Sequence, residues 1–187
     1  MAKAQAKRMA KARGKHASPA KDAIALLKAD HRQVEEWFGQ YEKARTEDRK
    51  LDLATRLCNA LTVHMKIEEG IFYPAFLEAT EDKDLHHEAE IEHDGAKKLI
   101  AEIEASGPDD DYYDSKVKVL SEMIKHHVKE EEQPGGMFAE ARKSDMDLAA
   151  LGRAMAARKA ELEGGSTEVP PSMRMGTNGR LGRIVAS

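Results

Sequence analysis

The chain has 187 residues, of which 41% are hydrophobic, 34% are charged and only 5% are aromatic. Its richness in Ala, Leu, Glu and Lys favours helices over sheets, and no apolar run approaches the ~20 residues of a membrane span. The net charge of −4 is unevenly distributed, because residues 1–16 contain six basic residues and no acid, whereas the middle of the chain is acidic. An acidic middle argues against a core that binds nucleic acid.

The chain begins with a basic stretch, residues 1–18, which we expect to be a disordered tail that can contact a protein partner. A helical bundle is expected over residues 19–143 and a C-terminal helical extension over residues 144–163. The remaining residues, 164–187, are rich in Gly, Pro and Ser ("GGSTEVPPSMRMGTNGRLG"), and this composition is typical of disordered segments.

Four amphipathic helices are predicted from apolar residues that recur every three or four positions. The first runs from about Pro19 to Arg45 with Ser18 as its N-cap, and the second begins near Asp48. Polar turns follow at "TEDKD" and "SGPDDD", and "QPGG" interrupts the fourth helix before a further amphipathic stretch, about Met137 to Glu163. Helices joined by short connections pack antiparallel. We therefore expect an all-α, up-down-up-down four-helix bundle with an additional C-terminal helical segment.

Each predicted helix of the bundle carries a histidine on its apolar face, and in two of them a glutamate follows four residues later. The strings "HMKIEE" at 64 and "HVKEEE" at 127 share the pattern H-x-K-x-E-E, and "DH" at 30 corresponds to "EH" at 92. The histidines of the two halves are 33 and 34 residues apart. This repetition indicates a duplicated helix hairpin.

These polar side chains are predicted to lie at one level of the bundle. Two residues of an antiparallel pair are level when they are equally far from the turn that joins their helices, at a rise of ~1.5 Å per residue. His31 and His64 lie 16 and 17 residues from the first turn, and the later pairs match to within one or two residues. The converging set is His31, His64, Glu68, His93, His127 and Glu131.

A layer of four histidines and two glutamates inside an apolar core indicates a metal site. Buried carboxylates without partners are strongly destabilising, and neutral histidines cannot pair with all of their oxygens. Four imidazoles and two carboxylates suit Fe, Mn or Zn better than Mg or Ca. Two bridging carboxylates could hold two ions, each with two histidines, and an added oxo or hydroxo bridge would still leave open positions for reaction.

The same residues resemble the HHE cation-binding domain of the hemerythrin-like family over roughly residues 20–143. The matching elements are His31, His64-x3-Glu68 followed by "EGIFYP", "EHD" with His93, and His127-x3-Glu131. The resemblance implies an antiparallel four-helix bundle around a non-haem di-iron centre, with two iron ions joined by an oxo or hydroxo bridge. Zn or Mn remains an alternative to iron. The family's ligand positions correspond to the six residues of the predicted layer.

Two departures from the family pattern argue against a simple reversible oxygen carrier. The oxygen-carrying hemerythrins have a second histidine four residues before the third-helix histidine, where this chain has Ala89. His86 and Glu90 lie near enough on that face to add a seventh ligand. The carriers also use an aspartate on the fourth helix, spaced differently from Glu131. The ferritin-like alternative requires two E-x-x-H motifs, and this chain has one such string, Glu90 to His93.

The expected function is binding of, or reaction with, a small molecule such as oxygen, nitric oxide or peroxide, in sensing or stress protection. Two alternatives stay open: a di-iron enzyme that consumes peroxide or nitric oxide, and a metal-storage or structural bundle. No nucleophile dyad, glycine-rich cofactor motif or further general acid is recognisable, which favours the binding or sensing protein. Cys58, the single cysteine, is expected to be a small buried residue and suits a reducing, cytoplasmic location.

Overall fold

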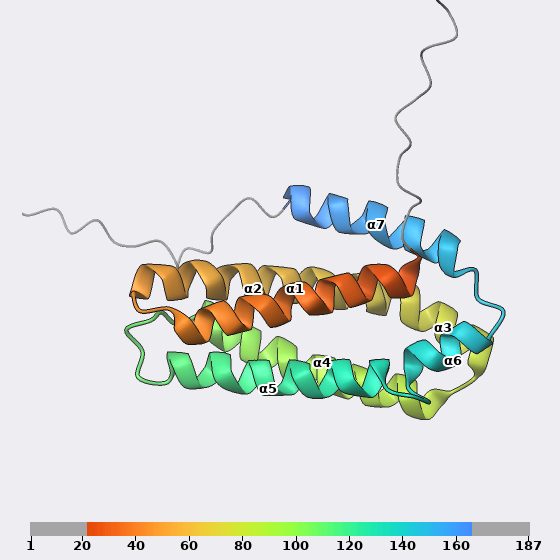
Figure 1. Cartoon of the computed structure of the whole chain (residues 1–187), viewed down its shortest axis with the longest axis horizontal. Coiled ribbons are helices and arrows are strands. Elements are labelled where there is room, and N and C mark those ends of the chain that lie inside the picture. The colour runs from red at the N-terminus through yellow and green to blue at the C-terminus, as the bar shows by residue number, and fades with distance from the viewer. Residues whose placement is uncertain (1–21, 166–187) are drawn as a thin grey trace, which may run out of the picture.

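The computed structural model describes residues 22–165, which are helical except for short turns (Figure 1). Four long helices form the bundle: α1 (Ala23–Lys43), α2 (Glu47–Ile67), α4 (Lys83–Glu104) and α5 (Tyr113–Glu132). A π-helical turn, η1 (Glu68–Phe72), and α3 (Tyr73–Thr80) extend α2, while α6 (Met137–Lys143) and α7 (Leu148–Gly165) follow α5. The predicted all-α antiparallel bundle with an additional C-terminal helical segment is confirmed. No helix of the described residues is both long and apolar enough to cross a membrane.

The first helix begins later than the sequence predicts. The predicted start near Pro19 with Ser18 as N-cap lies outside the described residues, whereas the described helix begins at Ala23, where Asp22 caps α1 by accepting a hydrogen bond from the Ala25 amide at 2.7 Å. Asp and Ser are comparable N-caps, so the preference for a capping residue does not by itself determine where the helix begins. Most of the two expected disordered tails, residues 1–18 and 164–187, lies outside the described residues.

Two breaks separate α5 from the C-terminal helix. Gly135 adopts a φ of 85°, and a Cβ on Gly136 would meet the carbonyl oxygen of Glu130 at 2.1 Å, so the "QPGG" turn requires glycine at both positions. The predicted stretch from Met137 to Glu163 is divided after α6, because the Asp147 side chain accepts a hydrogen bond from the first turn of α7. From there α7 turns back along α1 and α2 (Figure 1).

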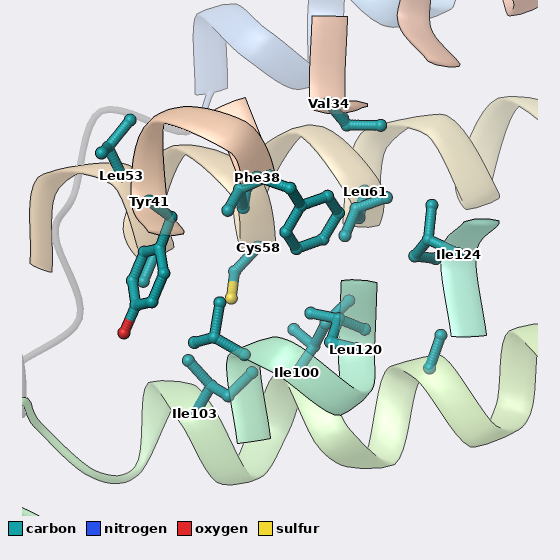
Figure 2. Close-up of a cluster of buried hydrophobic side chains, with 14 of the residues drawn as sticks. Val34, Phe38, Tyr41, Leu53, Cys58, Leu61, Ile100, Ile103, Leu120 and Ile124 are labelled. Atoms are coloured by element: carbon teal, nitrogen blue, oxygen red, sulfur yellow. The ribbon is translucent and has the colours of Figure 1, made fainter. Parts of the chain in front are cut away.

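A first apolar cluster fills the half of the bundle near the α1–α2 and α4–α5 turns. Figure 2 shows Phe38 and Leu61 of this cluster facing Leu120 of the opposite hairpin. The sulfur of Cys58 points into the same cluster, and the residue is 1% exposed. Burial raises the pKa of the Cys58 thiol to about 12, which keeps it protonated and unreactive. The prediction of a small buried cysteine is confirmed.

A second apolar cluster fills the other half of the bundle, where η1, α3, α6 and α7 meet. It includes Leu27 of α1, Phe72 of η1 and Ala89 of α4. Along α1, His31 lies between Leu27 of the second cluster and Val34 of the first. The same order holds along α4. The predicted polar layer therefore lies between two apolar clusters.

Candidate metal centre

Six buried polar side chains form one layer across the bundle, here named the histidine–glutamate layer. Each is at most 6% exposed. The layer takes one histidine from each long helix, one glutamate from η1 and one from α5. Its members are His31, His64, Glu68, His93, His127 and Glu131. The structure thus brings together the six residues that were predicted from the sequence to lie at one level of the bundle.

The four imidazoles form two close pairs. The Nε2 atoms of His31 and His64 are 3.1 Å apart, and those of His93 and His127 are 3.2 Å apart. Within each pair the rings are tilted, by 59° and 56°. Two nitrogens bound to one ion at ~2.1 Å and roughly at right angles would be ~3 Å apart. Each pair therefore has the spacing of two ligands on one ion.

The two glutamates lie between the imidazole pairs. The Glu68 Oε2 atom is 3.1 Å from His64 Nε2 and 3.4 Å from His93 Nε2. The Glu131 Oε2 atom is 3.5 Å from His31 Nε2 and 3.6 Å from His127 Nε2. Each carboxylate thus reaches one imidazole of each pair, which is the placement of a bridging ligand. Geometrically, His31, His64 and Glu68 can hold one ion, and Glu68, His93 and His127 another.

Three carboxylate oxygens in this layer have no hydrogen-bond partner among the described residues. They are both oxygens of Glu68 and Oε2 of Glu131. Leaving a buried carboxylate unpaired is costly, and ordinary packing does not offset that cost. A cation placed between the imidazole pairs would satisfy these oxygens and the Nε2 lone pairs together. The residues of the layer therefore fit a metal site.

Without a metal the layer carries conflicting charges. Burial raises the pKa of Glu131 to about 8, and the negative charge of Glu68 adds to this rise. Burial opposes the charge on Glu68 too, but His64 and His93 outweigh it and hold the Glu68 pKa below its usual value. Burial, with the charge of His64, lowers the pKa of His31 to about 4. Only one of the two carboxylates is therefore ionised at neutral pH.

A carboxylate faces the outer ring nitrogen, Nδ1, of every histidine in the layer. The pairs are His31–Glu132 at 2.8 Å, His93–Glu69 at 2.9 Å, His127–Glu92 at 2.7 Å and His64–Asp30 at 3.6 Å. In the three pairs within hydrogen-bond distance, the carboxylate holds the ring proton on Nδ1, so the lone pair of Nε2 faces the centre. His64 and Asp30 lie just beyond that distance. This arrangement is the usual support of metal-binding histidines.

These four outer carboxylates were not identified from the sequence. Each is the immediate neighbour of a residue in the layer: Asp30 and Glu92 precede histidines, while Glu69 and Glu132 follow glutamates. Neighbours on a helix differ by ~100° in direction, so the neighbour of one ligand can contact the histidine of the adjacent helix. The repeated strings "DH", "EH" and "E-E" could have identified these four acids, because each acid occurs at the same position in both halves of the duplicated hairpin.

Tyr73 is a further residue of the centre that the sequence analysis did not assign. Its hydroxyl lies 3.1 Å from His93 Nε2 and 3.3 Å from Glu131 Oε1, and the side chain is 1% exposed. The π-helical turn brings it there, since the Tyr73 amide bonds to the Glu68 carbonyl five residues earlier. Pro74 favours this turn, because it has no amide to offer the Gly70 carbonyl in an α-helix.

The two candidates for a seventh ligand do not reach the centre. The Glu90 side chain is 54% exposed and lies 3.6 Å from His86 at the surface of α4. The ring of His86 packs edge-on against the far side of the centre's tyrosine, with 6.0 Å between the His86 and Tyr73 centroids. Tyr73 and Ala89 share the second apolar cluster.

A small enclosed chamber adjoins the imidazoles on the side of the first apolar cluster. Its volume is about 10 Å³, and its walls include the four histidines of the layer and the apolar side chains of Val34, Ile124 and Val128. A groove of about 240 Å³ between α1 and α5, the α1–α5 groove, lies outside it. His31, Val34, Ile124 and Val128 border both spaces, so this wall separates the chamber from solvent.

Comparison with known proteins agrees with this geometry. A family model of the hemerythrin HHE cation binding domain matches residues 22–134. The chain is also similar to the crystal structure of a hemerythrin HHE cation binding domain-containing protein from Mycobacterium kansasii, with 25% identity and a TM-score of 0.65, over 78% of this chain and 89% of that one. No curated protein matches. The matched range contains the whole histidine–glutamate layer, and the chain belongs to the hemerythrin HHE cation-binding domain family.

Proposed function

We propose that this protein is a non-haem di-iron protein that binds or reacts with a small molecule in sensing or stress protection. The observation that carries the proposal is the set of unpartnered, buried carboxylate oxygens between two close imidazole pairs. Two cations would satisfy that set of oxygens and nitrogens. The proposed ligands are His31, His64, Glu68, His93, His127 and Glu131.

In this proposal His31 and His64 hold the first ion, and His93 and His127 hold the second. Glu68 and Glu131 would be shared by the two ions, together with an oxo or hydroxo group. Such nitrogen-rich sites accept Fe, Mn or Zn, so the metal in the cell is settled by measurement. A bound iron pair supplies the redox chemistry that oxygen, nitric oxide or peroxide requires.

The chamber supports a small, uncharged ligand. Its volume of about 10 Å³ is close to the space that one water molecule occupies, so only a molecule of two or a few atoms fits. Besides the imidazoles and Asp30, its walls are apolar side chains, which favour a small neutral molecule. Oxygen, nitric oxide and hydrogen peroxide meet both conditions. Bulk storage of metal would need a much larger interior space than this layer has.

A second candidate is an enzyme that consumes peroxide or nitric oxide, and Tyr73 favours it. Its hydroxyl lies 3.3 Å from the Glu131 Oε1 atom inside the layer. Burial raises the pKa of Tyr73 well above its usual value, so the group holds a proton at the centre. Reduction of peroxide to water takes up protons, whereas reversible binding of oxygen as such does not.

Location and partners remain part of the proposal. The single, buried Cys58 suits a cytoplasmic protein. A protein partner of the basic N-terminal tail would contact residues that lie outside the described part of the chain.

The test combines metal analysis with reactivity. Protein purified without metal is reconstituted with ferrous iron under anaerobic conditions, and iron per chain is measured. We expect two irons per chain and, after oxidation, a near-ultraviolet band with a visible shoulder from an oxo-bridged ferric pair. Stopped-flow mixing of the reduced protein with oxygen, nitric oxide or peroxide then identifies the ligand, and turnover distinguishes enzyme from sensor. One zinc per chain with no uptake of iron would overturn the proposal.

A further inference from the structure

The C-terminal helix α7 lies beyond residues 22–134, the range that the family model matches. It packs against α1, α2 and η1. These elements carry His31, His64 and Glu68, three of the residues proposed to hold the first ion. Met155 fixes this packing, since its side chain is fully buried in the second apolar cluster. The helix therefore covers the half of the bundle that holds the first ion.

A polar connection links α7 to that ion's ligands. The Lys159 Nζ atom lies 2.5 Å from Asp30 Oδ1. The other oxygen of Asp30, Oδ2, is 3.6 Å from His64 Nδ1. Lys159 and Asp30 are 27% and 16% exposed, so solvent screens their pairing only in part. The position of Asp30 against His64 thus depends on a cation that α7 supplies.

The His64–Asp30 pair differs from the three other histidine–carboxylate pairs. Those three have N–O distances of 2.7 to 2.9 Å. Their carboxylates also contact residues of the bundle helices themselves: Glu69 contacts Lys97, Glu92 contacts the His126 ring, and Glu132 contacts Arg32. Of the four outer carboxylates, Asp30 lies farthest from its histidine, and the lysine that pairs with it comes from α7 and not from the bundle.

We propose that Lys159 is a positioning residue through which α7 holds Asp30 against His64, and so controls how firmly the first ion is bound. The second ion, at His93 and His127, has outer carboxylates, Glu69 and Glu92, that no α7 side chain contacts among the ion pairs of the described residues. This inference rests on the proposed di-iron function. If Lys159 has this role, the two halves of the duplicated site hold their ions with unequal strength, because the retention of the first ion depends on the docking of the C-terminal helix.

The test measures how fast each iron leaves the reconstituted protein. Wild type, Lys159→Gln and Lys159→Arg are mixed with a ferrous chelator, and iron release is followed over time. In Lys159→Gln we expect a new fast phase of one iron per chain, about tenfold faster than in wild type, because the loss of outer support weakens metal sites by that order. The other iron leaves at the wild-type rate. Lys159→Arg keeps the cation and is expected to restore slow release.

Two further variants separate positioning from folding. Arg158→Gln removes a neighbouring cation whose partner, Glu161, lies 3.0 Å away on α7 itself, and it should release iron as wild type does. Asp30→Asn should reproduce the fast phase of iron release while α7 stays resistant to proteolysis. If Lys159→Gln detaches α7 from the bundle, the Asp30→Asn variant still tests the positioning role. Release from Lys159→Gln at the wild-type rate, or equal acceleration of both irons, would refute the positioning role. A wild type that binds no metal would overturn the proposed function as well.

Discussion

Replacing Glu131 by glutamine separates two effects of this carboxylate that oppose each other. In the metal-free protein the buried acid is destabilising, because it is forced to keep a proton that the unfolded chain would release. In the metal-bound protein the same acid is a proposed bridging ligand. We therefore expect Glu131→Gln to make the metal-free fold more stable and, at the same time, to reduce iron binding.

The magnitude follows from the pKa of Glu131. That pKa is about 8 in the fold, against a usual value of 4.5. Because the folded-state pKa is the higher one, its contribution to stability is complete below pH 4.5 and is lost as the pH rises through 8. At pH 7 the loss is on the order of 3 kcal/mol, and at pH 5 it is under about 1 kcal/mol. A neutral amide avoids this loss, which corresponds to a gain of roughly 10 °C in Tm at pH 7.

The assay is thermal unfolding of metal-free wild type and Glu131→Gln at pH 5 and pH 7, with iron per chain measured after reconstitution. Glu122→Gln is the matched control, since Glu122 is on the same helix but is 64% exposed. It should change neither stability nor iron content. A metal-free Glu131→Gln protein no more stable than wild type at pH 7 would refute the assignment of Glu131 as a strained buried acid.

Three other outcomes are expected. His64→Leu should lose at least one iron per chain while keeping its helicity. His87→Leu, at an exposed position of α4, should keep both irons. Equal iron content in His64→Leu and wild type would refute the assignment of His64 as a ligand. Removal of residues 1–16 and 166–187 should leave helicity and iron unchanged, and loss of iron would show that a tail helps to build the site. Val128→Phe should thicken the wall between the α1–α5 groove and the chamber and so slow the entry of small molecules. The reduced protein should then react more slowly with nitric oxide at unchanged iron content. An unchanged rate would mean that nitric oxide enters by another path.

The fold and the histidine–glutamate layer were predictable because both follow from spacing along helices. A 3.6-residue period selects one face, and helices of similar length joined by short turns place residues at matching depths. His31 and His93 could be assigned to one level without knowing any contact. The start of α1 was not predictable in the same way, because Ser18 and Asp22 offer N-caps of similar strength, ~1 kcal/mol each.

The outer parts of the site depend on features that a helical period does not contain. The contact between Glu69 and His93 requires the rotation of two helices about their axes, which packing determines. The position of Tyr73 depends on a π-helical turn, and the 3.6-residue period of an α-helix does not apply within such a turn. The pairing of Lys159 with Asp30 requires the docking of α7, whose apolar residues predict a helix but not its location.

Tyr73 offers a prediction about the second ion. Its oxygen is 3.1 Å from His93 Nε2, the same spacing as that between the imidazole nitrogens proposed to share an ion. Burial keeps the metal-free hydroxyl protonated, but a ferric ion at that spacing would reverse the preference and bind the phenolate. Tyr73→Phe should then keep two irons per chain and lose a visible absorption band of the ferric protein. Tyr112→Phe, at a position 71% exposed, should keep it. Coincident spectra of Tyr73→Phe and wild type would show instead that the tyrosine only donates a hydrogen bond to Glu131.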